Sequence, residues 1–167
     1  MQDRRHQQIR PLRRCSLNDF WKSVEDAHPG LQDAIGCYIF ATYTRGAARP
    51  WYVGKTEKAS FKKEAFQLSK RENYRTVLKT HKRGISQLYL IAKVQEGGKF
   101  RRPGKNGVRS IRKLEELLIG ACLIKNSKLV NKSTTKHLKE IHVPGYMNEA
   151  RGARSLEARD LAKLLGT

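Results

Sequence analysis

The stretch from Gly36 to Gly54 constrains the chain most, because it predicts a β-hairpin with a tyrosine on each strand. Apolar and aromatic residues flank a turn-rich middle at residues 45–50, which predicts two strands joined by a loop. Side chains alternate across a strand, so Tyr38 and Tyr52 are expected on the same face of the sheet. Each tyrosine lies two residues from a glycine, which leaves room beside the backbone. This arrangement suits a phosphate ester, although purely structural hairpins use the same residues.

The charge of the chain indicates the kind of partner. Its 167 residues suit one domain with a substantial core. Lysine and arginine number 35 against 15 acidic residues, which gives a formal net charge of +20. Such a charge attracts polyanions, so nucleic acid is the first expectation. A basic protein with no nucleic-acid function is the alternative.

Cysteine usage and hydropathy suggest a cellular environment. The three cysteines, Cys15, Cys37 and Cys122, are odd in number and lie far apart without a C-x-x-C motif. This pattern favours reduced thiols and a cytoplasmic location over a disulfide framework. No apolar run approaches the ~20 residues that a membrane-spanning helix needs.

The rest of the chain predicts one α+β domain with additions at both ends. Residues 1–15 are expected to be a disordered basic arm, residues 16–132 the main domain, and residues 133–167 a C-terminal extension packed on it. The other expected elements are a cover helix over 17–27 capped by Ser16, a long helix over 61–81 with a possible break near Asn73, a third strand over 85–94, and a helix over 111–125 capped by Ser110.

The segment from Gly97 to Arg109 combines glycine-rich turns with positive charge that no acidic residue opposes. This composition suits a mobile loop that grips phosphate groups, with a solvated insertion as the equal alternative. The candidate phosphate contacts in it are Lys99, Arg101, Arg102, Lys105 and Arg109.

Glu115 is the candidate metal ligand. It borders the apolar stripe of the helix predicted over residues 111–125, where a lone carboxylate is unfavourable. It could pair with a lysine or arginine. It could instead hold Mg²⁺, which takes one or two carboxylates, keeps several waters and binds substrate phosphate. Glu116 points about 100° away around the same helix and is the neighbour to distinguish from it.

Four elements in order resemble the GIY-YIG nucleases. The two tripeptides that name that family correspond to Gly36-Cys37-Tyr38 and Tyr52-Val53-Gly54, the helix glutamate to Glu115, and a later asparagine to Asn131 in Leu129-Val130-Asn131. The resemblance implies a small, mainly antiparallel three-stranded sheet flanked by helices. It also implies hydrolysis of phosphodiester bonds in DNA, double-stranded in the first instance, with Mg²⁺ or Mn²⁺ held by Glu115.

The same resemblance implies roles for the site residues. Tyr38 would hold or deprotonate the attacking water, which requires nearby cations to lower its pKa from about 10. Tyr52 would position the phosphate or the water, and Asn131 would orient the hairpin or the neighbourhood of the metal. Lys55 and Thr56, which follow Gly54, are expected to contact phosphate groups.

One family position departs from the pattern. The family has an arginine about eight residues past the second tripeptide, where this chain has Lys62 followed by Lys63. Lysine supplies charge but lacks the flat, two-pronged donor of arginine. Lys62 or Lys63 is therefore expected to stabilise the phosphate charge, with Lys62 favoured by its helical register and Glu64 as its possible partner. The alternatives are that a basic residue of the 99–109 loop takes this role, or that the protein is a catalytically weakened or inactive nucleic-acid-binding module on the same scaffold.

Overall fold

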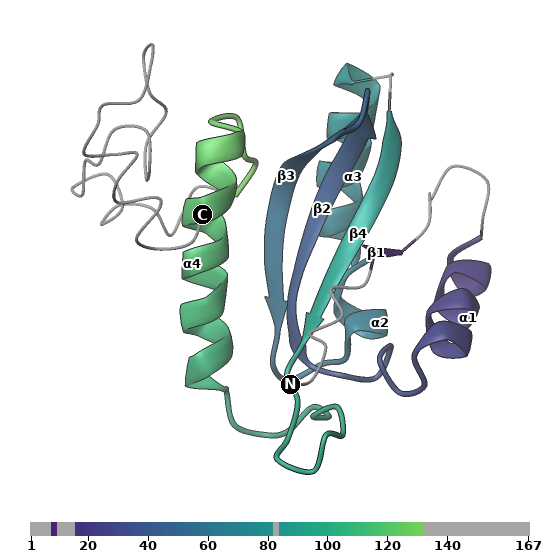
Figure 1. The fold of residues 1–167 in the computed structure, drawn as a ribbon, viewed down its shortest axis with the longest axis vertical. Helices are drawn as coiled ribbons and strands as arrows, with labels where there is room; N and C mark the ends of the chain where they lie inside the picture. The colour runs from purple at the N-terminus through teal and green to yellow at the C-terminus, as the bar shows by residue number, and fades with distance from the viewer. Residues whose placement is uncertain (1–7, 10–15, 82–83, 132–167) are drawn as a thin grey trace.

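The computed structural model describes residues 8–9, 16–81 and 84–131. The predicted C-terminal extension lies outside these residues, as does the predicted arm except for residues 8–9. The described part is an antiparallel sheet with helices on both faces (Figure 1). Its strand order is β1-β4-β2-β3, in which β2 (Gly36–Thr44), β3 (Ala47–Thr56) and β4 (Ile85–Ala92) are long. The predicted α+β class, with three antiparallel strands flanked by helices, is confirmed.

Strand β1 (Gln8–Ile9) is a short addition that the sequence did not predict. It pairs antiparallel with the outer side of β4, opposite Tyr89 and Leu88. These two residues belong to the predicted arm of residues 1–15, whose other positions lie outside the described residues. Because β1 covers one side of the sheet, β3 is the edge strand on the other side.

The hairpin of β2 and β3 is tighter than the expected loop over residues 45–50. Arg45 and Gly46 both have positive φ, 51° and 84°, which is the pattern of a two-residue turn matched to strand twist. Pro50 lies inside β3, where the edge position tolerates its missing N–H. The register shifts between Phe40 and Ala41, so Trp51 is the extra residue of a β-bulge. Trp51 and Tyr52 therefore contribute to the same core cluster despite being neighbours.

Three helices cover the face of the sheet that carries Tyr38 and Phe40. Helix α1 (Leu17–Ala27) begins at Ser16, whose hydroxyl accepts from the Asp19 backbone N–H while the Asp19 carboxylate accepts in return. This reciprocal cap confirms the predicted start of the helix.

The predicted helix over 61–81 is interrupted early, and not near Asn73. Helix α2 (Phe61–Glu64) ends before Phe66, and α3 (Leu68–Thr80) begins after Gln67. The Phe66 ring packs edge-on against Phe20 at 5.6 Å and Trp21 at 5.9 Å. Burial of this aromatic cluster explains the break, because one continuous helix cannot direct all of its apolar residues to a single face.

Helix α4 (Arg109–Lys125) lies on the opposite face of the sheet, beside β3 (Figure 1). It buries Ile111, Ile119 and Cys122 against residues that include Cys37 and Val53. The expected cap at Ser110 is wrong, since the helix begins at Arg109, two residues before the expected start, and its cap residue Val108 makes no side-chain hydrogen bond. Within the described residues, no helix has the length and apolar character needed to cross a bilayer.

Candidate active site

The two predicted tyrosines lie together on one face of the hairpin, as expected. Their rings are stacked at 6.2 Å between centroids with 28° between planes. Tyr38 is fully buried, whereas Tyr52 is half-buried and reaches the surface. Tyr52 is therefore the phenol that a substrate can contact directly, and Tyr38 supports it from within.

Gly54 makes this arrangement possible. It lies directly opposite Tyr38 in the antiparallel register, and the tyrosine ring crosses over its Cα. A Cβ atom at Gly54 would lie 2.4 Å from Tyr38 Cζ and 2.5 Å from its hydroxyl oxygen. Gly36 is equally restricted, since a Cβ there would lie 2.1 Å from the Ile91 carbonyl oxygen. The two glycines thus serve close packing within the sheet.

The expected activation of Tyr38 by cations is not found. Burial raises the pKa of Tyr38 well above its usual value, and the neighbouring Tyr74, Tyr52 and Glu64 raise it further. Tyr38 is therefore neutral at physiological pH and can donate a hydrogen bond, but it is not poised to deprotonate water. Its buried hydroxyl group lies beside the hydroxyl groups of Tyr52 and Tyr74, which contribute to its shifted pKa.

Tyr52 is the point where the charged groups of the site act together. Burial raises its pKa, the Lys70 ammonium group lowers it, and the carboxylates of Glu115 and Glu64 raise it. These groups come from α2, α3 and α4, which lie on both faces of the sheet. The phenol itself is on β3, which is an edge strand of the sheet.

The cation that acts on Tyr52 is Lys70, and not Lys62 or Lys63 as expected. Both predicted lysines are exposed on the four-residue helix α2. Lys70 Nζ donates to Glu64 Oε1 at 2.6 Å and to Gln67 Oε1 at 3.2 Å. Residues six apart would lie about 120° apart around a continuous helix. The break between α2 and α3 brings Glu64 and Lys70 together, and neither glycine nor proline marks that break in the sequence.

Glu115 lies on α4 with its carboxylate toward the end of β3. Lys55 Nζ donates to Glu115 Oε2, which gives the ion pair that the sequence offered as the alternative to a metal site. The side chains are 34% and 12% exposed, respectively. The other carboxylate oxygen, Oε1, has no hydrogen-bond partner among the described residues and is not fully buried. Glu115 can therefore accept one further ligand on the solvent side.

A second ion pair fixes α4 against the loop after β3. Arg112 Nε donates to Glu57 Oε1 at 3.1 Å, and Glu57 Oε1 also accepts from the Val108 backbone N–H. Arg112 precedes Glu115 by one turn of the helix, so this contact orients the turn that presents the carboxylate. Gly107 leaves room for the guanidinium group, because a Cβ there would lie 2.0 Å from Arg112 Nη2.

Asn131 binds the free edge of β3. Its side-chain oxygen accepts from the Val53 backbone N–H at 3.1 Å, and its amide nitrogen donates to the Val53 carbonyl oxygen. The Val130 backbone N–H adds a hydrogen bond to the Trp51 carbonyl oxygen at 2.8 Å. Asn131 therefore imitates a neighbouring strand at the residue between Tyr52 and Gly54. This geometry is the hairpin-orienting role that the resemblance implied.

The predicted phosphate contacts divide into two groups. Thr56 is 3% exposed and its hydroxyl donates to the Ala59 carbonyl oxygen, so the expectation that it contacts phosphate is wrong. The five basic residues of the 97–109 segment are all exposed. The first part of that segment is ordered, because Arg101 and Lys93 extend a backbone ladder to Ile35 and Val94 bridges Phe100.

No protein-family model, curated protein or solved structure matches the chain. Within the described residues, no three His, Cys, Asp or Glu side chains gather as a multidentate metal site. The interpretation of the site therefore depends on its own residues and geometry.

Proposed function

We propose that the protein is a metal-dependent endonuclease of the GIY-YIG type, which hydrolyses phosphodiester bonds in DNA. The observation that supports this proposal is the stacking of Tyr38 on the half-buried Tyr52, on the strand that also carries Lys55, the ion-pair partner of Glu115. Two neutral phenols, two lysines and one accessible carboxylate oxygen are groups that bind a phosphodiester and one divalent cation.

The exposure of each side chain in the site indicates the role we assign to it. Tyr52 reaches the surface and donates its O–H to a phosphate oxygen or to the attacking water. Tyr38, buried behind it, stacks on the Tyr52 ring and holds it in place. Lys70 supplies positive charge beside Tyr52 and stabilises the charge that builds on the phosphate. Glu64 orients Lys70 through its ion pair.

Glu115 fits a single Mg²⁺ or Mn²⁺ ion. The free Oε1 provides one carboxylate ligand, while water and substrate phosphate would supply the remaining positions. The bound ion would polarise the phosphate and stabilise the leaving oxygen. Lys55, already bound to Oε2, lies where it can contact the same phosphate. Asn131 keeps β3 in register beneath these groups.

A binding module without catalytic activity is the second candidate. It is favoured by one observation, the ion pair in which Lys55 already neutralises Glu115. In that case the positive charge would serve DNA binding alone.

Cleavage of supercoiled plasmid by the purified protein separates the two functions. A nuclease converts the plasmid to nicked or linear forms with Mg²⁺ and not with EDTA. A binding module retards the plasmid on a gel in both buffers and leaves it supercoiled. Retardation without cleavage, in Mg²⁺ and in Mn²⁺, would contradict the proposed activity.

A further inference from the structure

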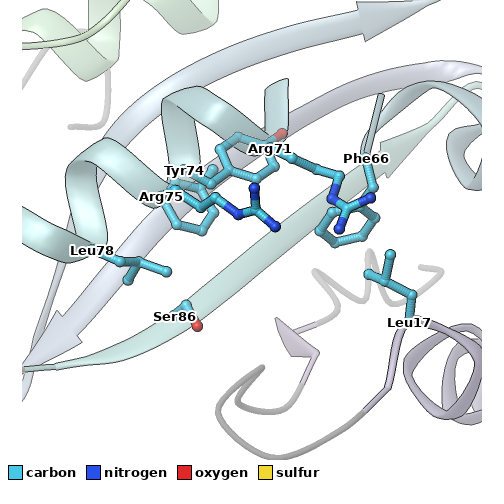
Figure 2. Close-up of a pocket in the computed structure, with 8 residues that line it drawn as sticks. Leu17, Phe66, Arg71, Tyr74, Arg75, Leu78 and Ser86 are labelled. Atoms are coloured by element: carbon cyan, nitrogen blue, oxygen red, sulfur yellow. The ribbon is translucent and has the colours of Figure 1, made fainter. Parts of the chain in front are cut away.

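A cavity of about 410 Å³ lies on the sheet face that carries helices α1 and α3 (Figure 2). Its volume is within the range of small-molecule sites in proteins. Its floor is formed by Phe40 of β2 and Ser86 of β4, and α3 forms one wall. None of the residues considered above for metal or phosphate binding lines it.

Two arginines of α3 give the cavity its charge. Arg71 and Arg75 are four residues apart, so they share one side of the helix. Figure 2 shows both guanidinium groups directed over the cavity. Neither has a hydrogen bond or ion pair among the described residues, in contrast to Lys70 on the same helix. Two unpaired guanidinium groups at one cavity favour a phosphate group, which they can bind in a bidentate manner.

The remaining walls are apolar and aromatic. Phe66, Leu78 and Leu17 surround the arginines, and the exposed edge of Leu17 comes from α1 (Figure 2). A duplex backbone presents phosphates and sugars to a protein surface and has no planar apolar group to insert. An unpaired nucleotide presents both a phosphate and a base, whose flat face packs well against aromatic and apolar side chains.

Tyr74 connects this cavity to the candidate active site. Its ring lines the cavity, is stacked on Phe40 at 4.2 Å and meets the Tyr52 ring edge-on at 5.9 Å. Its hydroxyl group donates to the Ala65 carbonyl oxygen at 3.0 Å, which fixes the ring between the two sites. The cavity and Tyr52 are therefore connected through one aromatic side chain.

We propose that this cavity binds one unpaired nucleotide of the DNA strand, with its phosphate on Arg71 and Arg75 and its base against the apolar wall. The proposal rests on the nucleic-acid partner of the proposed function, and it adds a preference for DNA with single-stranded character. It does not depend on cleavage.

Binding measured in EDTA tests the proposal separately from any nuclease activity. The probes are a labelled single-stranded oligonucleotide and a duplex of the same length, followed by fluorescence anisotropy. The test variant is R71Q/R75Q. The matched control is K113Q/K125Q, which removes the same charge from exposed positions on α4, across the sheet. Circular dichroism melts confirm that both variants fold.

We expect R71Q/R75Q to lower the affinity for the single strand by about tenfold or more, because phosphate and base contacts are lost together. The loss for the duplex should be smaller and should match that of K113Q/K125Q. The conservative variant R71K/R75K should recover part of the single-strand affinity, since it restores charge without the planar fork. Equal losses for both probes, or equal losses for both variants, would overturn the proposal. The first result would indicate a duplex phosphate contact, and the second only a general effect of charge.

Discussion

Replacement of Gly54 by alanine should destabilise the fold through a single contact, the ring of Tyr38. The added Cβ would lie 2.4 Å from Cζ, and ordinary contact begins at 3.4 Å, so the ring must move by about 1 Å. It cannot move freely, because Tyr52 stacks on it and Phe61 meets it edge-on at 6.4 Å. Overpacking of this kind costs about 1–3 kcal/mol. Reduced entropy of the unfolded chain offsets about 0.4–1 kcal/mol of that cost.

The assay is urea unfolding of the wild type, Gly54→Ala, Tyr38→Leu and the double variant, with Gly97→Ala as the control. Nothing lies within 4 Å of a Cβ at Gly97, so this control should unfold close to the wild type. Leucine at position 38 lacks the ring atoms that clash, so Gly54→Ala should cost almost nothing in that background. The two single changes should therefore couple by about 1–2 kcal/mol.

Two results would refute this reasoning. In the first, Gly54→Ala unfolds at the same urea concentration as Gly97→Ala, which would mean that the ring moves at no cost. In the second, Gly54→Ala lowers the free energy of unfolding by the same amount in the Tyr38→Leu background, which would place the cause in the backbone. In the expected case, the displaced Tyr38 should also slow cleavage by the folded fraction of Gly54→Ala.

Three further predictions use other contacts. Asn131→Ala should lower the free energy of unfolding by about 1–2 kcal/mol, because two hydrogen bonds to β3 are lost; an unchanged urea midpoint would contradict this. Burial raises the pKa of Tyr38 and Tyr74 in the folded state, so stability should be intact below about pH 10, the unfolded value, and should fall as the pH rises beyond it. Spectrophotometric titration at alkaline pH should accordingly show two tyrosines that ionise only on unfolding, and their early titration in folded protein would be the contrary result. Lys70→Ala should slow cleavage by ~10²-fold while Lys62→Ala stays near the wild-type rate; the reverse order would restore the first helix lysine as the catalytic cation.

Local alternation and capping made much of the fold predictable. The period of two along β2 and β3 places Tyr38 and Tyr52 on one face, and the Ser16 cap fixes the start of α1. These features depend on residues that are close together in the sequence, so they can be predicted from one sequence alone. The same alternation predicted the antiparallel sheet.

Contacts between distant elements were not predictable in the same way. The break after Glu64 results from burial of Phe66 against α1, and the sequence near it has no helix-breaking residue. Lys70 pairs with Glu64 because of that break, a contact that helical register alone did not predict. The β-bulge at Trp51 and the burial of Thr56 likewise depend on packing across the sheet. The five basic residues of the 97–109 segment, by contrast, are exposed as its composition suggested.

The most direct test of the proposed metal-dependent nuclease compares Glu115→Gln with Glu116→Gln in plasmid cleavage with Mg²⁺. Both changes remove one carboxylate from adjacent positions of α4, but only Glu115 forms the ion pair with Lys55 and raises the pKa of Tyr52. Glu115→Gln should bind DNA nearly as tightly as the wild type and lose Mg²⁺-dependent cleavage, whereas Glu116→Gln should cleave at the wild-type rate. Cleavage by Glu115→Gln at the wild-type rate would contradict the assignment of this carboxylate to the metal.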